Sequence, residues 1–89
     1  MESIALLTRE LKRAIVVEGL DCLLFGRERF EEWATEYESN QEIIVPGERQ
    51  YLESFRYFVV LGLESGFVPF NPRDSPAKVE QMLDEFEKE

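Results

Sequence analysis

Apolar residues recur along most of this chain with the period of an α-helix. The pattern is clearest at 27–39, where four apolar side chains are spaced i, i+3, i+4 and i+7: Phe30, Trp33, Ala34 and Tyr37. Glutamates fill most of the remaining positions of this stretch. Because the spacing separates an apolar face from a charged one, it predicts an amphipathic helix over 27–39.

Three further stretches show the same period and predict helices over about 3–18, 48–65 and 75–88. Ser3 is the expected N-cap of the first of these helices, and Gly19 is expected to end it. With the helix at 27–39, these segments predict an all-α protein: a small bundle of about four helices.

The predicted helix 48–65 is apolar on most of its circumference. Tyr57, Val60 and Leu61 add apolar surface on the side opposite its main apolar face. A helix with this distribution is usually the central one, so we expect it to lie between the others. The additional apolar surface also suggests that a homo-oligomer could form through this helix.

Two short stretches leave an alternative open. The β-branched residues before Pro46 suggest one short extended segment near 42–45. A small hairpin at 14–25 would change the fold class to α+β, because the period does not separate helix from strand in short apolar runs. We favour the all-α fold, with residues 1–89 forming a single domain, since so short a chain supports only one core.

The residue types that the chain lacks exclude several kinds of chemistry. It has no histidine, which excludes a His-based triad, a His proton shuttle and a zinc site of ordinary type. Its one cysteine, Cys22, lies among apolar neighbours and is expected to be a small buried side chain. A single cysteine also suits a reducing compartment, and no apolar run approaches the ~18 residues of a membrane span. We expect a soluble, cytoplasmic protein.

The net charge of −9 is distributed unevenly. Residues 1–26 carry a net charge of −1, and residues 27–89 carry −8. Solubility alone could explain these charges. The functional interpretation is that acidic helical faces steer a basic partner towards the protein. The acidic residues to which we assign this hypothetical role are Glu28, Glu31, Glu32, Glu36, Glu38, Glu80, Asp84 and Glu87.

The loop that follows the third predicted helix is a second candidate for partner binding. Pro69 and Pro72 prevent it from being helical and make it stiff. Phe67 and Phe70 are expected to fold back over the core. The alternative is that these two aromatic rings are exposed and act as preordered anchors for the partner.

The leading functional hypothesis is therefore a small non-enzymatic protein that binds or regulates another protein with a basic surface and needs no cofactor. The alternative is a nucleic-acid mimic, whose carboxylates would imitate phosphates and inhibit a nucleic-acid-binding protein. Direct binding to nucleic acid is not expected, because the basic residues form at most a small patch in an acidic chain.

A Mg²⁺-dependent helical hydrolase is the less favoured alternative. Its metal would be held by carboxylate oxygens, which are the ligands that Mg²⁺ prefers. The acids available for this purpose on two predicted helices are Glu28, Glu31, Glu32, Glu80 and Asp84. On the helix 27–39 they lie opposite the apolar face, where solvent rather than a cleft is expected. We therefore predict no metal site and no catalytic residue.

Overall fold

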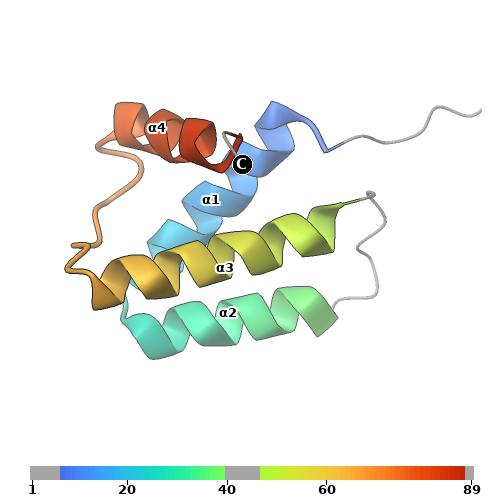
Figure 1. Ribbon diagram of the computed structural model, residues 1–89. Coiled ribbons are helices and arrows are strands. Elements are labelled where there is room, and N and C mark those ends of the chain that lie inside the picture. Colours follow the sequence, from blue (N-terminus) through green and yellow to red (C-terminus); the bar gives the residue numbers. More distant parts are fainter. Residues whose placement is uncertain (1–6, 40–46, 88–89) are drawn as a thin grey trace, which may run out of the picture.

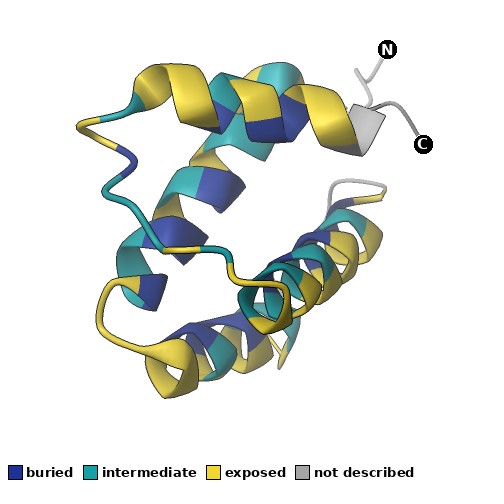
Figure 2. Ribbon diagram, turned by 60° about the vertical axis from the view of Figure 1, so that its left-hand side comes forward, coloured by how far each residue is buried: buried dark blue, intermediate teal, exposed yellow. Residues whose placement is uncertain are grey.

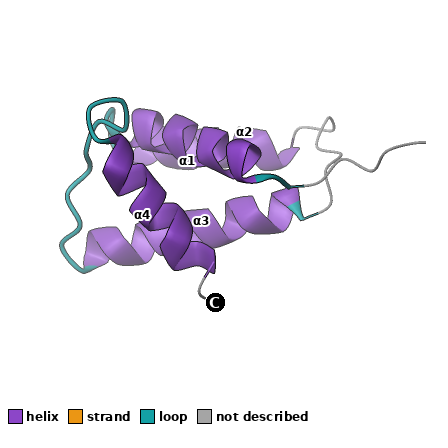
Figure 3. Ribbon diagram, turned by 90° about the horizontal axis from the view of Figure 1, so that it is seen from above, coloured by secondary structure: helices purple, strands orange, loops and turns teal. Residues whose placement is uncertain are grey.

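Four α-helices make up the regular structure of residues 7–39 and 47–87, the two parts of the chain that the computed structural model describes (Figure 1). No strand occurs within these two parts (Figure 3). The predicted all-α fold is therefore confirmed, whereas the segment near 42–45 lies outside the described residues. The helices are α1 (Arg9–Leu23), α2 (Arg27–Ser39), α3 (Glu48–Glu64) and α4 (Pro76–Glu87).

Helix α1 begins and ends later than predicted. Its N-cap is Thr8, whose side-chain oxygen accepts a hydrogen bond from the backbone N–H of Leu11 at 3.2 Å. At the other end, the helix continues through Gly19 to Leu23. The predicted range 3–18 is wrong because Gly19 does not end the helix but is buried in the middle of a helix–helix contact.

The alternative hairpin at 14–25 is also wrong, because helix α1 occupies most of this range. The buried residues of α1 follow the helical period along one face, and they are Ile15, Val16, Gly19, Leu20 and Leu23. The backbone turns only after Leu23, where Gly26 adopts a φ of 116° and allows α2 to start. The apolar run within 14–25 fits a helix or a strand by its period alone. In the folded protein it is helical, and neighbouring helices bury its apolar face.

The central helix is α1, not the helix 48–65 that the sequence predicts. Helix α1 packs against each of the other three, crossing between α4 on one side and the antiparallel pair α2 and α3 on the other (Figure 1). Helix α3 packs mainly on α2. The additional apolar side chains of α3 do not meet a fourth helix, since Tyr57 and Leu61 are exposed and Val60 is half-buried.

An aromatic cluster fills the space between α1, α2 and α3. Phe30 and Phe55 are completely buried, and their ring centroids lie 5.8 Å apart in an edge-to-face arrangement. The ring of Trp33 packs against both, with its centroid 5.7 Å from that of Phe30 and 6.3 Å from that of Phe55. Helix α4 completes the core from the other side with Val79, Met82 and Leu83. The buried part of this helix lies along the side that faces the rest of the fold (Figure 2).

Helix α3 ends at Glu64 in a Schellman motif around Gly66, which has a φ of 99°. The N–H of Phe67 donates to the carbonyl of Gly62 at 2.7 Å, and that of Gly66 donates to Leu63 at 3.2 Å. Gly66 is thus the left-handed residue at which α3 ends. The chain then crosses to α4, which starts with Pro76 in its first turn, where the missing N–H costs nothing.

Candidate functional site

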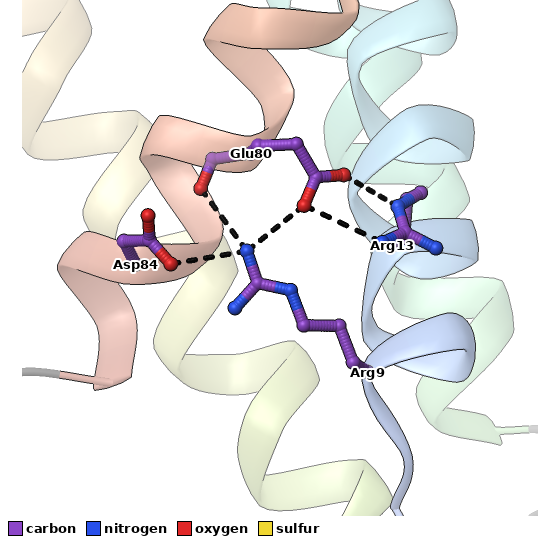
Figure 4. Close-up of polar contacts among 4 residues, drawn as sticks. All are labelled: Arg9, Arg13, Glu80 and Asp84. Atoms are coloured by element: carbon purple, nitrogen blue, oxygen red, sulfur yellow. Dashed lines mark hydrogen bonds and ion pairs between the residues drawn. The ribbon is translucent and has the colours of Figure 1, made fainter.

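Two of the acids predicted for α4, Glu80 and Asp84, pair with arginines of helix α1. Glu80 accepts hydrogen bonds from Arg9 Nη2 at 2.9 Å and from Arg13 Nε at 2.5 Å, and Asp84 lies 3.0 Å from Arg9 Nη2 (Figure 4). The Glu80 carboxylate thus bridges two arginines that are one turn apart on α1. Both predicted binding residues therefore take part in an ion-pair network that joins α4 to α1.

The arginines change the protonation of Glu80. Hydrogen bonds from Arg13 and Arg9 stabilise the charged carboxylate and lower its pKa to about 2. The hydrogen bonds to Glu80 in turn raise the pKa of both guanidinium groups. Glu80 therefore remains ionised in the folded protein at pH values where an ordinary glutamate is already protonated.

This lowered pKa predicts a loss of stability in acid. The network stabilises the folded state fully above pH 4.5, the ordinary pKa of a glutamate, and this contribution is lost as the pH falls towards 2. Urea unfolding between pH 7 and pH 2 should show wild type more stable than Glu80→Gln at pH 7, with the difference shrinking in acid. Glu85→Gln, which replaces an exposed acid of α4, is the control and should show no such trend. A difference that stays constant with pH would contradict the assignment.

Two of the acids predicted on α2 join this helix to α3. Arg56 donates from Nε to Glu31 Oε1 at 2.6 Å and lies with Nη1 3.4 Å from Glu38 Oε2. The three side chains are about one-third exposed or less. Arg56 offsets one of these two negative charges, so the pair adds less to the outer field of the protein than the sequence suggests.

The remaining acids of α2 lie on the side of the helix that faces away from the core. Glu28, Glu32 and Glu36 are exposed, and we call these three residues the α2 acidic face. Glu32 lies 3.6 Å from Arg29 on the same helix, which is a weak exposed pair. A shallow hollow runs along this helix and is lined by Arg27, Glu28, Glu31, Glu32, Thr35 and Glu36. The α2 acidic face is therefore an open surface with one helix as its floor.

A second hollow lies between α1 and α2 and combines acidic with aromatic side chains. It is lined by Glu18, Trp33, Glu36 and Tyr37. The indole Nε1 of Trp33 donates to Glu18 Oε1 at 2.8 Å, which satisfies the polar atom of an otherwise buried ring. Glu36 thus belongs both to this hollow and to the α2 acidic face.

The sequence reasoning missed a buried acid, Glu48, which is only 7% exposed. The hydroxyl of Tyr37 donates a hydrogen bond to its carboxylate, and its place in the first turn of α3 favours a negative charge. Burial and this hydrogen bond raise the pKa of Tyr37 above its ordinary value. The available signal was the position of Glu48 on the apolar side of α3, in line with Leu52 and Phe55.

The two phenylalanines of the loop after α3 and the cysteine of α1 all pack against the core. Phe67 and Phe70 are half-buried, pack against the core and contact each other edge to face at 6.1 Å, which confirms that they fold back. Cys22 is also half-buried, and burial raises the pKa of its thiol. Cys22 thus packs against the core, as predicted, but is less buried than predicted. The side chain of Glu87 lies outside what the structure describes.

Of the acids predicted to bind a partner, the three of the α2 acidic face are exposed; Asp84 is also exposed, but it pairs with Arg9 of α1. Among the described residues, no three acidic or cysteine side chains gather in a way that could hold a metal ion. In the same part of the chain, no helix has the length and apolar character needed to cross a bilayer. No protein-family model, curated protein or solved structure matches this chain.

Proposed function

We propose that this protein is a non-enzymatic binding module that recognises a basic surface on another protein through the α2 acidic face. The observation that carries the proposal is the different use of the acids. Glu31, Glu38, Glu80 and Asp84 contact arginines of other helices, whereas the arginine beside Glu32 belongs to α2 itself and all three residues of the α2 acidic face are exposed. A charge that is not needed to hold the fold together is available to a partner.

The arrangement of these carboxylates favours a protein surface as the partner. They follow one another at i, i+4 and i+8, so they form a row along one side of a single helix. Such a row attracts cations over about 10 Å at moderate salt and raises association rates. The hollow beside it has one helix as its floor, which suits lysine and arginine side chains that protrude from a partner.

The test compares two triple variants that remove the same charge. The first is Glu28→Gln, Glu32→Gln and Glu36→Gln; the matched control is Glu10→Gln, Asp74→Asn and Glu85→Gln, at exposed positions on other elements. A partner is captured from lysate with the wild-type protein, and its affinity for each variant is measured at several salt concentrations.

The α2 variant is expected to lose about tenfold or more in affinity, corresponding to about 1.4 kcal/mol, and to show a weaker salt dependence than wild type. The control is expected to change much less. Equal losses in both variants would contradict a role for the α2 acidic face. Adding duplex DNA then tests the nucleic-acid mimic: competition for the partner supports mimicry, and simultaneous binding excludes it.

A further inference from the structure

The outer side of α3 carries an apolar pair that the fold does not use. Tyr57 is 67% exposed and Leu61 is 44% exposed, and they lie one turn apart on the same side of the helix. Glu53 lies one turn before Tyr57, and Glu64 lies three residues after Leu61; both are exposed. We call these four residues the α3 outer stripe: two apolar side chains with a carboxylate at each end.

The α3 outer stripe differs from the other exposed apolar residues in how firmly it is held. Leu24, Phe25 and Val68 are also exposed, but each lies in a connection between helices. Tyr57 and Leu61 lie on a helix whose opposite side is anchored in the core by Phe55 and Val59. A rigid backbone lowers the entropy lost on binding, and tyrosine is one of the residues that most often dominate interfaces.

Charge decides between the candidate occupants of this stripe. A second copy packed antiparallel about the midpoint between Tyr57 and Leu61 would place Glu53 beside Glu64 of the other copy. A parallel copy would place each of these glutamates beside its own equivalent. Both arrangements bring like charges together, between chains that each carry −9. A helix with apolar residues in its middle and cations about one turn to either side is complementary instead.

We infer that the α3 outer stripe binds a cationic amphipathic helix of a partner protein. The apolar face of that helix would cover Tyr57 and Leu61, and its lysines or arginines would pair with Glu53 and Glu64. The inference rests on the proposed function, because it assumes a basic protein partner. The inference goes further than the proposed function in two respects. It specifies that the partner binds with a helix, and it adds an apolar contact site outside the α2 acidic face.

The probe is a synthetic 18-residue helix with leucines on one face and lysines on the other. A peptide of the same composition but scrambled order is its control. Binding to the full chain is measured by fluorescence anisotropy. Tyr57→Ala with Leu61→Ala is expected to weaken binding of the amphipathic peptide at least tenfold. Leu24→Ala with Val68→Ala removes two exposed apolar side chains elsewhere and is expected to change it less than threefold.

The charges are tested separately, and circular dichroism confirms that each variant is folded. Glu53→Gln with Glu64→Gln is expected to weaken binding and reduce its salt dependence. Unchanged peptide binding after loss of Tyr57 and Leu61 overturns the inference. If the α2 triple variant still weakens peptide binding in that case, the proposed function stands. Peptide binding that is insensitive to salt and that no variant changes overturns both the inference and the proposed function. A dimer seen in sedimentation that disappears with Tyr57→Ala and Leu61→Ala also overturns the inference, because a second copy is then the occupant.

Discussion

Replacing Phe55 with alanine is expected to lower the free energy of unfolding by about 3–5 kcal/mol. The side chain is 0% exposed and lies where three helices meet. Its ring contacts Phe30 and Trp33 of α2 edge to face and lies against Gly19 of α1. Alanine therefore removes apolar burial and also leaves a cavity that rigid neighbouring helices cannot close.

The measurement is urea unfolding followed by circular dichroism at neutral pH. A small domain has about 5–15 kcal/mol of stability, so the Phe55→Ala protein should unfold at a much lower urea concentration than wild type. Tyr57→Ala, an aromatic replacement two residues further along α3, is the control and should change stability by about 0.5 kcal/mol or less. Similar effects at both positions would mean that α3 is packed differently from the arrangement described.

Replacing Gly19 with alanine is expected to destabilise the protein by about 2 kcal/mol, although the same change inside most helices is favourable by about 1 kcal/mol. A Cβ atom at Gly19 would lie 2.5 Å from Phe55 Cε2 and 2.9 Å from Trp33 Cζ3. Both neighbours are rings held in the core, so they cannot turn away without disturbing other contacts. The helix must shift or the aromatic cluster must rearrange.

Gly62→Ala is the comparison, because it also replaces a glycine inside a helix. The Cβ added there would lie 3.3 Å from Phe67 Cβ, and a small movement of the loop residue would relieve this contact. Its effect should be smaller than that of Gly19→Ala. Combining Gly19→Ala with Phe55→Leu should cost less than the sum of the single changes, since leucine gives up the ring atom that collides. A rise in the melting temperature of Gly19→Ala alone would contradict the described contact.

The charge pattern of the sequence predicts which acids lie on the outer side of a helix, but not which of them pair with arginines of other helices. The sequence placed Glu28, Glu32 and Glu36 correctly on the side of α2 away from its apolar stripe, because that placement follows from helical spacing alone. It did not distinguish Glu28, which is exposed, from Glu31, which pairs with Arg56 25 residues away. Nor did it reveal that Glu80 pairs with Arg13, which is 67 residues away. Such pairs depend on how the helices cross.

The apolar period was enough to predict that the chain forms helices and where α2 begins and ends, because it acts over a few neighbouring positions. The central place of α1 and its continuation past Gly19 depend instead on contacts between helices. A glycine ends a helix or lets two helices approach closely, and the local sequence is compatible with both. The choice depends on whether a ring from a distant segment, here Phe55, occupies the space that a side chain would need.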